Sequence, residues 1–229
     1  MSASLPFARP KAIFFDVNET LLDMSPLKVA VNAAFKSPAA FNQWFGLVLQ
    51  HSLVATVTDE YFNFGTLADA ALDMTANMLE KPPLTHAEKH DLTALLTQLP
   101  AHPDVPAGLE RLRAAGYRLL ALTNSPPTTL AAQLAHAGLT EYFEQALSVD
   151  AVQRYKPHPD TYHYAAKQAG VLPAEALLVA AHGWDVAGAL HAGLLAGFIA
   201  RPGQTLYPLA PPPTSQAPTL LELATQLGA

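Results

Sequence analysis

The chain has 229 residues, half of them hydrophobic, and carries a formal net charge of -6 without a single cysteine. This length accommodates one large core, or a core domain with a smaller insertion. The lack of cysteine excludes disulfides, thiolate metal sites and cysteine nucleophiles, and an acidic balance without a basic run argues against nucleic acid as a main partner.

Membrane and export signals are the next features that the sequence excludes. No apolar run approaches the ~20 residues that a membrane span needs. Residues 1–10 lack the charged start and apolar middle of a secretory signal. We therefore expect a cytoplasmic protein with no membrane partner, in which any anionic substrate must be held by local donors.

The first predicted element is a strand that ends in a carboxylate. Residues 12–15 form an apolar run, and Asp16 follows directly, with Asn18, Glu19 and Thr20 in the next turn. Ligands of open α/β sheets bind at the carboxyl ends of the strands, which makes Asp16 a candidate nucleophile. A lone Asp in such a place is more often a cap or a turn former, so this interpretation needs support from other segments.

Residues 26–97 are predicted to be helical, with helices over 27–35, 40–56, 66–79 and 87–99. The fourth begins with a capping-box spacing from Thr85 to Glu88. We assign residues 23–100 to an inserted helical domain, whose apolar helix over 40–56 could pair in a homodimer. The third helix has one apolar face, which we expect to be core, made by Leu67, Ala70, Ala71, Met74 and Met78.

From residue 103 onward the chain alternates between helices and strands. Strands are predicted over 117–122, 145–149, 176–181 and 196–200, with helices between them. Ser125 is predicted to cap the helix that Pro126 begins. The proline-rich stretch 208–218 is predicted to be a loop before a short helix over 220–227. This order predicts a doubly wound parallel α/β sheet, in a core domain made of residues 1–22 and 101–229.

Polar residues follow the later strands as well. Thr123 and Asn124, with the backbone of Ser125, offer donors at a helix N-terminus that would bind a phosphate or a carboxylate, although they could serve only as a cap. Lys156 precedes Pro157, and a cation beside Asp16 would keep that carboxylate ionised. An isolated lysine is more commonly a solvated surface group. The last such segment runs from His182 to Asp185.

Together these segments resemble the haloacid dehalogenase (HAD) superfamily, whose first motif is a strand ending in Asp-x-Asp/Tyr-x-Thr. Asp16 and Thr20 match this motif and Asn18 does not, while Lys156-Pro157 with Tyr162 resembles the third motif. The resemblance covers residues 11–201 and is closest to the type II (S)-2-haloacid dehalogenases. It implies a Rossmann-like core with a helical cap. In that family an Asp displaces halide from C2, and water then cleaves the resulting ester without a metal or another cofactor.

The resemblance also implies roles for single residues. Asp16 is the expected nucleophile, Thr20 its support, Lys156 its ion-pair partner and Asp185 the group that orients water. Substrate contacts are expected from Val17, Asn18, Thr123, Asn124, Tyr162, His182, Trp184, Trp44 and Phe45. His182 stands where the family usually has Asn. Phe45 stands where it has a halide-binding arginine, a residue type that is absent from residues 21–100.

Two departures argue against the phosphatases of the same superfamily. These enzymes use an acid two residues after the nucleophile, where this chain has Asn18, and general acid work needs an ionisable group. Their magnesium also needs several oxygen ligands, but Ala181 replaces one carboxylate of the fourth motif. We therefore predict metal-independent hydrolysis of small 2-haloacids. A small-molecule phosphatase and a catalytically silent binding protein stay open as alternatives.

Overall fold

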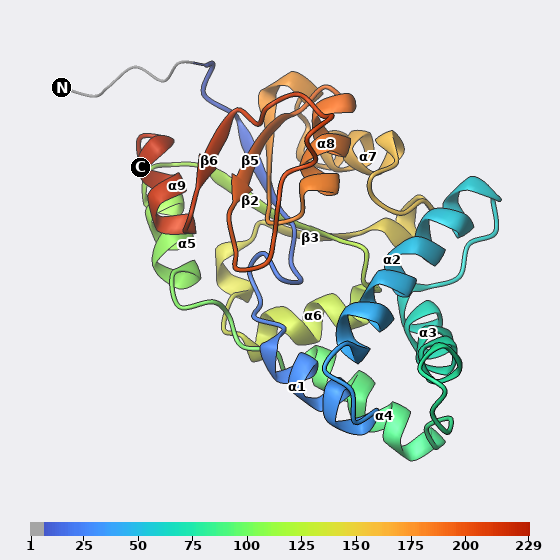
Figure 1. Cartoon of the computed structure of the whole chain (residues 1–229). Helices are drawn as coiled ribbons and strands as arrows, with labels where there is room; N and C mark the ends of the chain where they lie inside the picture. Colours follow the sequence, from blue (N-terminus) through green and yellow to red (C-terminus); the bar gives the residue numbers. More distant parts are fainter. Residues whose placement is uncertain (1–6) are drawn as a thin grey trace.

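The computed structural model describes residues 7–229. The prediction that residues 1–10 are not a secretory signal therefore falls mostly outside the described residues. Within this part of the chain, six parallel strands form one sheet in the order β3-β2-β1-β4-β5-β6 (Figure 1). The predicted doubly wound α/β fold is thus confirmed. The strands are β1 (Ala12–Phe15), β2 (Arg118–Thr123), β3 (Gln145–Ser148), β4 (Ala176–Ala180), β5 (Leu195–Ile199) and β6 (Ser215–Ala217).

Helices cover both faces of the sheet. Because side chains alternate along a strand, Phe14 packs with the cluster that contains α7 (Pro159–Ala169) and α8 (Gly183–His191), whereas Phe15 packs on the opposite side. That side is covered by α5 (Val105–Ala114), α6 (Pro127–His136) and α9 (Leu220–Gln226). Short 3-10 helices lie at Thr140–Tyr142, Val149–Ala151 and Pro173–Glu175. Both faces of β1 are therefore buried, as a central parallel strand requires.

The chain between β1 and α5 forms a group of helices that lies beside the sheet in Figure 1. These are α1 (Ser25–Ala34), α2 (Ala40–Val57), α3 (Phe64–Met78) and α4 (His86–Ala94), the last followed by a 3-10 helix at Leu95–Thr97. The capping box of Thr85 and Glu88 is present. The chain enters and leaves this group along adjacent paths, since Asp23 N donates to Pro100 O at 2.8 Å and His102 N donates to Leu21 O at 2.9 Å.

The structure corrects two predictions in the loops. The stretch 208–218 is not a loop throughout, because β6 pairs with β5 between Pro213 and Pro218; at a sheet edge, the missing N–H groups of flanking prolines break no ladder. The cap of α6 is Pro126 rather than Ser125, and the Ser125 hydroxyl accepts a hydrogen bond from Asn18 instead. No helix in residues 7–229 is both long and apolar enough to cross a bilayer.

Candidate active site

The candidate site lies at the carboxyl ends of β1 and β4, two neighbouring strands from which the chain winds in opposite directions. Such a switch point leaves a crevice above the strand ends. Asp16 follows β1, and its backbone N donates to Val179 O at 3.0 Å, which ties it to β4. His182 and Asp185 stand at the start of α8, directly after β4. The fold thus brings residues about 170 positions apart to one point.

The two carboxylate oxygens of Asp16 have different partners. Oδ1 accepts a hydrogen bond from Lys156 Nζ at 2.8 Å. Oδ2 accepts one from Thr20 Oγ1 at 2.7 Å and lies 3.1 Å from His182 Nδ1. Burial alone raises the pKa of Asp16, but the Lys156 charge and the His182 contacts together hold it well below its usual range. The result is a buried carboxylate that stays ionised.

Lys156 is the buried cation of the site, with no exposed side-chain surface. Its ammonium donates to Asp16 Oδ1, to Asp185 Oδ2 at 2.7 Å and to Leu122 O at 3.1 Å, which uses all three N–H groups. Its backbone N donates to Asn124 Oδ1 at 3.1 Å. Burial lowers the pKa of Lys156, yet the two carboxylates raise it above the ordinary value. Lys156 is therefore charged and immobilised between Asp16 and Asp185.

Asp185 binds Lys156, and Tyr162 in turn binds Asp185. Tyr162 Oη donates to Asp185 Oδ1 at 2.6 Å, so both oxygens of Asp185 are occupied. Both side chains are completely buried, and burial raises the pKa of each. Gly188 permits this packing, because a Cβ there would lie 2.4 Å from Pro157 Cβ and 2.5 Å from Tyr162 Oη. In this arrangement Asp185 positions Lys156, and Tyr162 positions Asp185.

His182 bridges two acidic side chains. Its Nδ1 faces Asp16 Oδ2, and its Nε2 lies 2.7 Å from Glu19 Oε2. The imidazole stacks on Trp184, with ring centroids 5.1 Å apart, and Phe45 of α2 lies against it at 6.4 Å. Burial by itself lowers the pKa of His182, but the hydrogen bonds and charges of Asp16 and Glu19 raise it to about 9.

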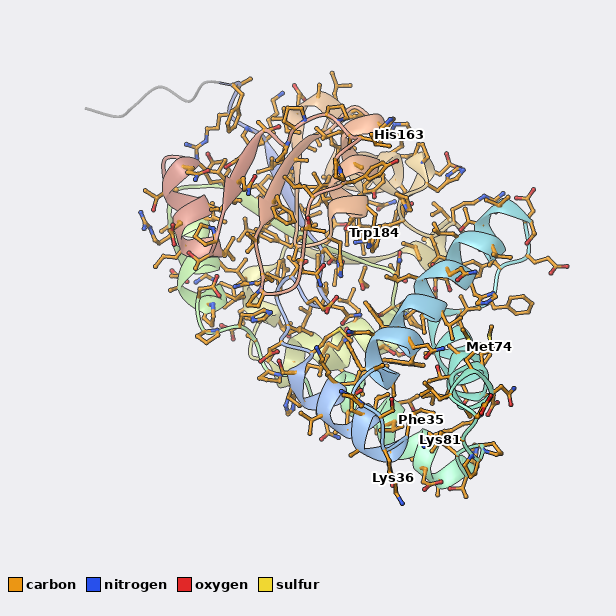
Figure 2. The ribbon with its side chains drawn as sticks, in the orientation of Figure 1. Phe35, Lys36, Met74, Lys81, His163 and Trp184 are labelled. Atoms are coloured by element: carbon orange, nitrogen blue, oxygen red, sulfur yellow. The ribbon has the colours of Figure 1, made fainter. Side chains whose placement is uncertain are left out.

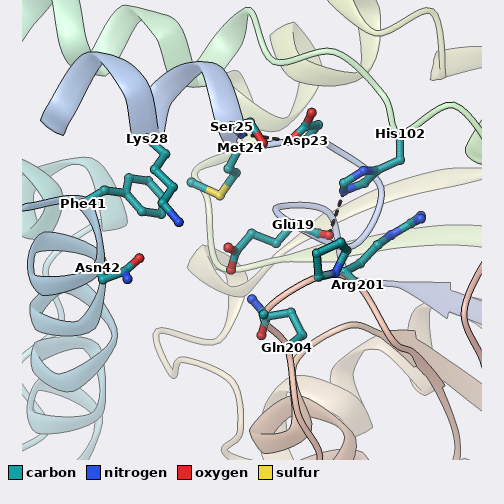
Figure 3. Close-up of a pocket in the computed structure, with 12 residues that line it drawn as sticks. Glu19, Asp23, Met24, Ser25, Lys28, Phe41, Asn42, His102, Arg201 and Gln204 are labelled. Atoms are coloured by element: carbon teal, nitrogen blue, oxygen red, sulfur yellow. Dashed lines mark hydrogen bonds between the residues drawn. The ribbon is translucent and has the colours of Figure 1, made fainter. Parts of the chain in front are cut away.

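Two adjoining cavities open beside this network. One, of about 250 Å³, has His182, Trp184 and Phe45 in its wall. The other, of about 350 Å³, is lined instead by residues that include Lys28 and Arg201. Both share Glu19, Phe41, Asn42 and Gln204. Figure 3 shows the Glu19 carboxylate pointing into the larger cavity, between Lys28 and Gln204. Trp184 lies on the side of the α/β core that faces α2 (Figure 2).

The structure does not place every expected substrate contact at these cavities. Trp44 Nε1 donates to Ala68 O at 2.9 Å, so Trp44 packs within the helical group. Tyr162 and Val17 are completely buried, and neither lines either of the two cavities. Thr123 Oγ1 accepts from Ser125 N at 3.1 Å and so stabilises the turn after β2.

Asn18 and Asn124, the two amide side chains among the expected contacts, differ in whether their N–H groups are free to bind a ligand. Asn18 is engaged on both sides, since its Nδ2 donates to Ser125 and its Oδ1 accepts from Gln133 at 2.9 Å. In contrast, Asn124 Nδ2 has no hydrogen-bond partner in the described part of the chain, and Asn124 is 6% exposed. Asn124 therefore keeps a donor for an incoming ligand.

Sequence reasoning missed two residues that shape the site. In the sequence Glu19 is only one residue of a polar turn, yet in the structure it binds His182. Arg201 donates to Thr20 O at 3.2 Å and 3.0 Å and pairs with Asp104 at 2.7 Å, which fixes the loop after β1. Neither role has a local signal, because His182 lies 163 residues from Glu19, and Thr20 and Asp104 lie 181 and 97 residues from Arg201.

The side chains of the site do not form a cluster suited to a metal ion. No group of three or more His, Asp or Glu side chains in residues 7–229 is arranged to hold a metal ion. The place between the carboxylates of Asp16 and Asp185 is taken by the Lys156 ammonium.

Comparisons with known proteins agree with this geometry. A family model described as haloacid dehalogenase-like hydrolase matches residues 10–193. The (S)-2-haloacid dehalogenase of Xanthobacter autotrophicus is 32% identical over 196 residues, covering 85% of this chain and 76% of that protein. The phosphoglycolate phosphatase of Colwellia psychrerythraea is 30% identical over 177 residues, covering 74% and 75%. The structure of L-2-haloacid dehalogenase from Xanthobacter autotrophicus with chloropropionic acid covalently bound superposes with a TM-score of 0.86 at 27% identity, covering 94% of this chain and 97% of that one.

Proposed function

The chain belongs to the haloacid dehalogenase-like hydrolases, and on this premise we propose that it hydrolyses the carbon–halogen bond of small 2-haloacids through an ester on Asp16. The observation that carries the proposal is the buried contact of 2.8 Å between Asp16 Oδ1 and Lys156 Nζ. It keeps a carboxylate ionised and aimed at the end of the central strand, as a nucleophile requires.

The reaction has two steps. In the first, an Asp16 oxygen attacks C2 of the acid, a C–O bond forms, and the halide leaves with the electron pair of the C–X bond. In the second, water attacks Cγ of Asp16 and the bond from Cγ to the ester oxygen breaks; one proton of the water passes to that oxygen and the other is released to solvent. The 2-hydroxyacid leaves, and the Asp16 carboxylate is restored. Because halide needs no proton to depart, Asn18 in place of an acid does not obstruct the first step.

In this proposal, neutral hydrogen-bond donors and the shape of the cavity hold the substrate. Asn124 Nδ2 is a free donor beside Lys156 and suits the carboxylate of the haloacid. The leaving halide faces the cavity next to His182, where the amides of Asn42 and Gln204 take the place of the arginine that residues 21–100 lack.

We further propose that residues 23–100 act as a cap domain over a core made of residues 1–22 and 101–229. Support comes from the adjacent entry and exit paths at Asp23 and His102, and from Phe45 of α2, which lies against His182. A cap of this kind would exclude water from the first step. The cytoplasmic location and the homodimer stay predictions from the sequence.

A small-molecule phosphatase is the second candidate, favoured by the similarity to phosphoglycolate phosphatase. Phosphate esters leave as alkoxides that need a proton, yet the side chain of Asn18 is bound to Ser125 and Gln133 and has no acidic group. The two candidates predict different products and different responses to magnesium.

The test is a panel of chloro-, bromo- and fluoroacids together with simple phosphate monoesters. We expect halide release and a transient mass increase on the Asp16 peptide equal to the mass of the acid less that of the hydrogen halide. The matched control is Glu141→Gln, a charge removal at an exposed residue far from the site. Release of phosphate but not halide would reject the dehalogenase in favour of the phosphatase.

A further inference from the structure

We infer that Tyr61 and Asp150, two residues outside the cavities of the site, are positioning residues for the proposed reaction. Tyr61 lies between α2 and α3, and Asp150 lies in the loop after β3. Their contact aligns Lys156 and Asn124 with the Asp16 carboxylate. The inference rests on the proposed function, because it adds residues that prepare the first of its two steps.

A set of side chains, which we call the clasp, joins the link between α2 and α3 to the loop after β3. Tyr61 Oη donates to Asp150 Oδ1, and Arg154 pairs with Asp59. The rings of Tyr61 and Tyr155 stack with their centroids 5.2 Å apart. The clasp comprises these five residues. It attaches the helical group to the core at a second place, far along the chain from the entry and exit paths.

Tyr155 is the member of the clasp that adjoins the buried cation of the site. It is completely buried, its backbone N donates to Thr56 Oγ1 of α2 at 3.0 Å, and its Oη donates to Phe62 O. Lys156 is the next residue, and its ammonium contacts Asp16 at 2.8 Å. A shift of Tyr155 against α2 would therefore move this cation, and a misplacement of about 1 Å can lower a rate by about 100-fold.

Asp150 is connected to the turn after β2 that carries Asn124. Its backbone N donates to Ser148 Oγ at 3.2 Å, and Ser148 Oγ donates to Ser125 O at 2.7 Å. From the other end of the same loop, Lys156 N donates to Asn124 Oδ1 at 3.1 Å. This contact prevents the Asn124 amide from turning over, because only its oxygen can accept from an N–H. One loop, fixed by the clasp, thus orients both the cation and the free Nδ2 donor.

The backbone on each side of the clasp has an unusual conformation. Asp59 has a φ of 61° and Gln153 a φ of 52°, both in the left-handed region, which is disfavoured for residues with a Cβ. Arg154 connects the two, since it donates to Gln153 O at 3.1 Å and pairs with Asp59. Such conformations persist where surrounding contacts fix them, and they cluster at functional sites. The clasp therefore holds two conformations that the separate segments would not favour.

The contact between Tyr61 and Asp150 is the part of the clasp that we expect to matter most. Both residues are half-buried, and a hydroxyl that donates to a carboxylate makes a strong hydrogen bond. The Asp59 side chain is 73% exposed, so its pair with Arg154 contributes little. Burial and the hydrogen bond to Asp150 raise the pKa of Tyr61, which keeps its hydroxyl a donor across the pH range of an assay. Tyr61→Phe removes this contact and leaves a ring to stack on Tyr155.

Steady-state kinetics of four variants test the inference. We expect Tyr61→Phe and Asp150→Ala each to lower kcat/KM for the chloroacids of the panel by about tenfold, the scale of a hydrogen bond to a charged group. KM should rise because Asn124 is displaced, and kcat should fall because Lys156 is. The double variant should also lose about tenfold, since both substitutions remove one and the same contact. Asp150→Asn keeps the acceptor oxygen and should recover most of the activity.

The matched control is Tyr142→Phe, which removes a hydroxyl from a half-buried ring before β3, at the end of the sheet away from the site. It should match the wild type in kcat, KM and pH profile. Amide hydrogen exchange of residues 150–156 in the substrate-free protein should be faster in Tyr61→Phe than in the wild type, and unchanged in the control.

The pH profile is a readout that a purely structural contact would not move. In the described part of the chain, the charged groups that contact Asp16 are Lys156 and His182, and Asp185 is joined to it through Lys156. A displaced Lys156 lowers the pKa of Asp16 less. The acid limb of kcat/KM should therefore move to higher pH in both impaired single variants. It should stay near its wild-type position in the asparagine variant, which also controls for the lost charge.

The outcomes distinguish this inference from the function on which it rests. Wild-type kinetics and an unchanged acid limb in Tyr61→Phe and Asp150→Ala, even with a lower thermal midpoint, would overturn the inference alone. Independent losses that multiply to about 100-fold in the double variant would overturn it too, and so would faster turnover, because the clasp would then restrain the site. If the wild type releases no halide from any acid of the panel, the proposed function fails and the inference fails with it.

Discussion

Replacing Lys156 with methionine removes one charge and keeps most of the side-chain volume. The ammonium lies 2.8 Å from Asp16 and 2.7 Å from Asp185 and is shielded from solvent, so the variant leaves two buried carboxylates without their cation. Removing one partner of a buried ion pair costs about 3–5 kcal/mol of folding stability. Loss of one preorganised electrostatic group lowers turnover by about 100-fold or more.

The sign of the pH effect follows from Asp16. In the wild type its lowered pKa contributes stability above the unfolded pKa, and this contribution is lost as the pH falls through the folded pKa. Without Lys156, burial is opposed only by the His182 contacts, so the pKa of Asp16 rises above its wild-type position. The ionised Asp16 then stabilises the fold less, so the variant should lose more stability relative to the wild type at neutral pH than at acidic pH. The acid limb of its activity should move to higher pH.

The assay combines halide release across a pH series with urea unfolding at acidic and at neutral pH. Lys167→Met is the matched control, because this substitution removes the same charge at an exposed position on α7. Wild-type rates and an unchanged pH profile in a folded Lys156→Met would refute the assignment of this lysine to the nucleophile.

Three other changes test separate parts of the site. Asp16→Asn should abolish turnover and leave a folded protein with a lower thermal midpoint, because the buried ion pair with Lys156 is lost; normal turnover by a sample shown by mass to be free of deamidation would contradict the nucleophile assignment. Exhaustive chelation with EDTA should leave activity unchanged, whereas loss of activity that magnesium restores would favour the phosphatase. Gly188→Ala should lower the free energy of unfolding by about 1–3 kcal/mol, because the new Cβ would meet Pro157 and Tyr162; unaltered urea unfolding would show that α8 can shift without cost.

Much of the fold could be predicted because its determinants are local. Buried apolar runs at 12–15 and 176–180, and the glycine that ends α7 at Gly170, mark element boundaries without tertiary information. The short β6 could not be predicted in this way. Its three residues become a strand only because the edge of β5 is available to pair with them.

The site shows the same division between local and non-local information. Asp16 is recognisable as a carboxylate at a strand end, and sheet topology alone brings it to the loop after β4. The role of Glu19 depends on a left-handed backbone and on His182, which no local pattern encodes. Trp44 shows the same limit. The resemblance to the family predicts a substrate contact there, whereas the partner of its indole N–H, the backbone oxygen of Ala68 inside the helical group, is set by tertiary packing.

The most direct test of the account is a single turnover of a 2-haloacid in water that carries the heavy oxygen isotope. The account predicts that the label enters the carboxylate of Asp16, because water attacks Cγ, while the first product molecule takes its new oxygen from unlabelled Asp16. Label found in the first 2-hydroxyacid, with none on the Asp16 peptide, would mean that water attacks C2 directly and would contradict covalent catalysis by Asp16.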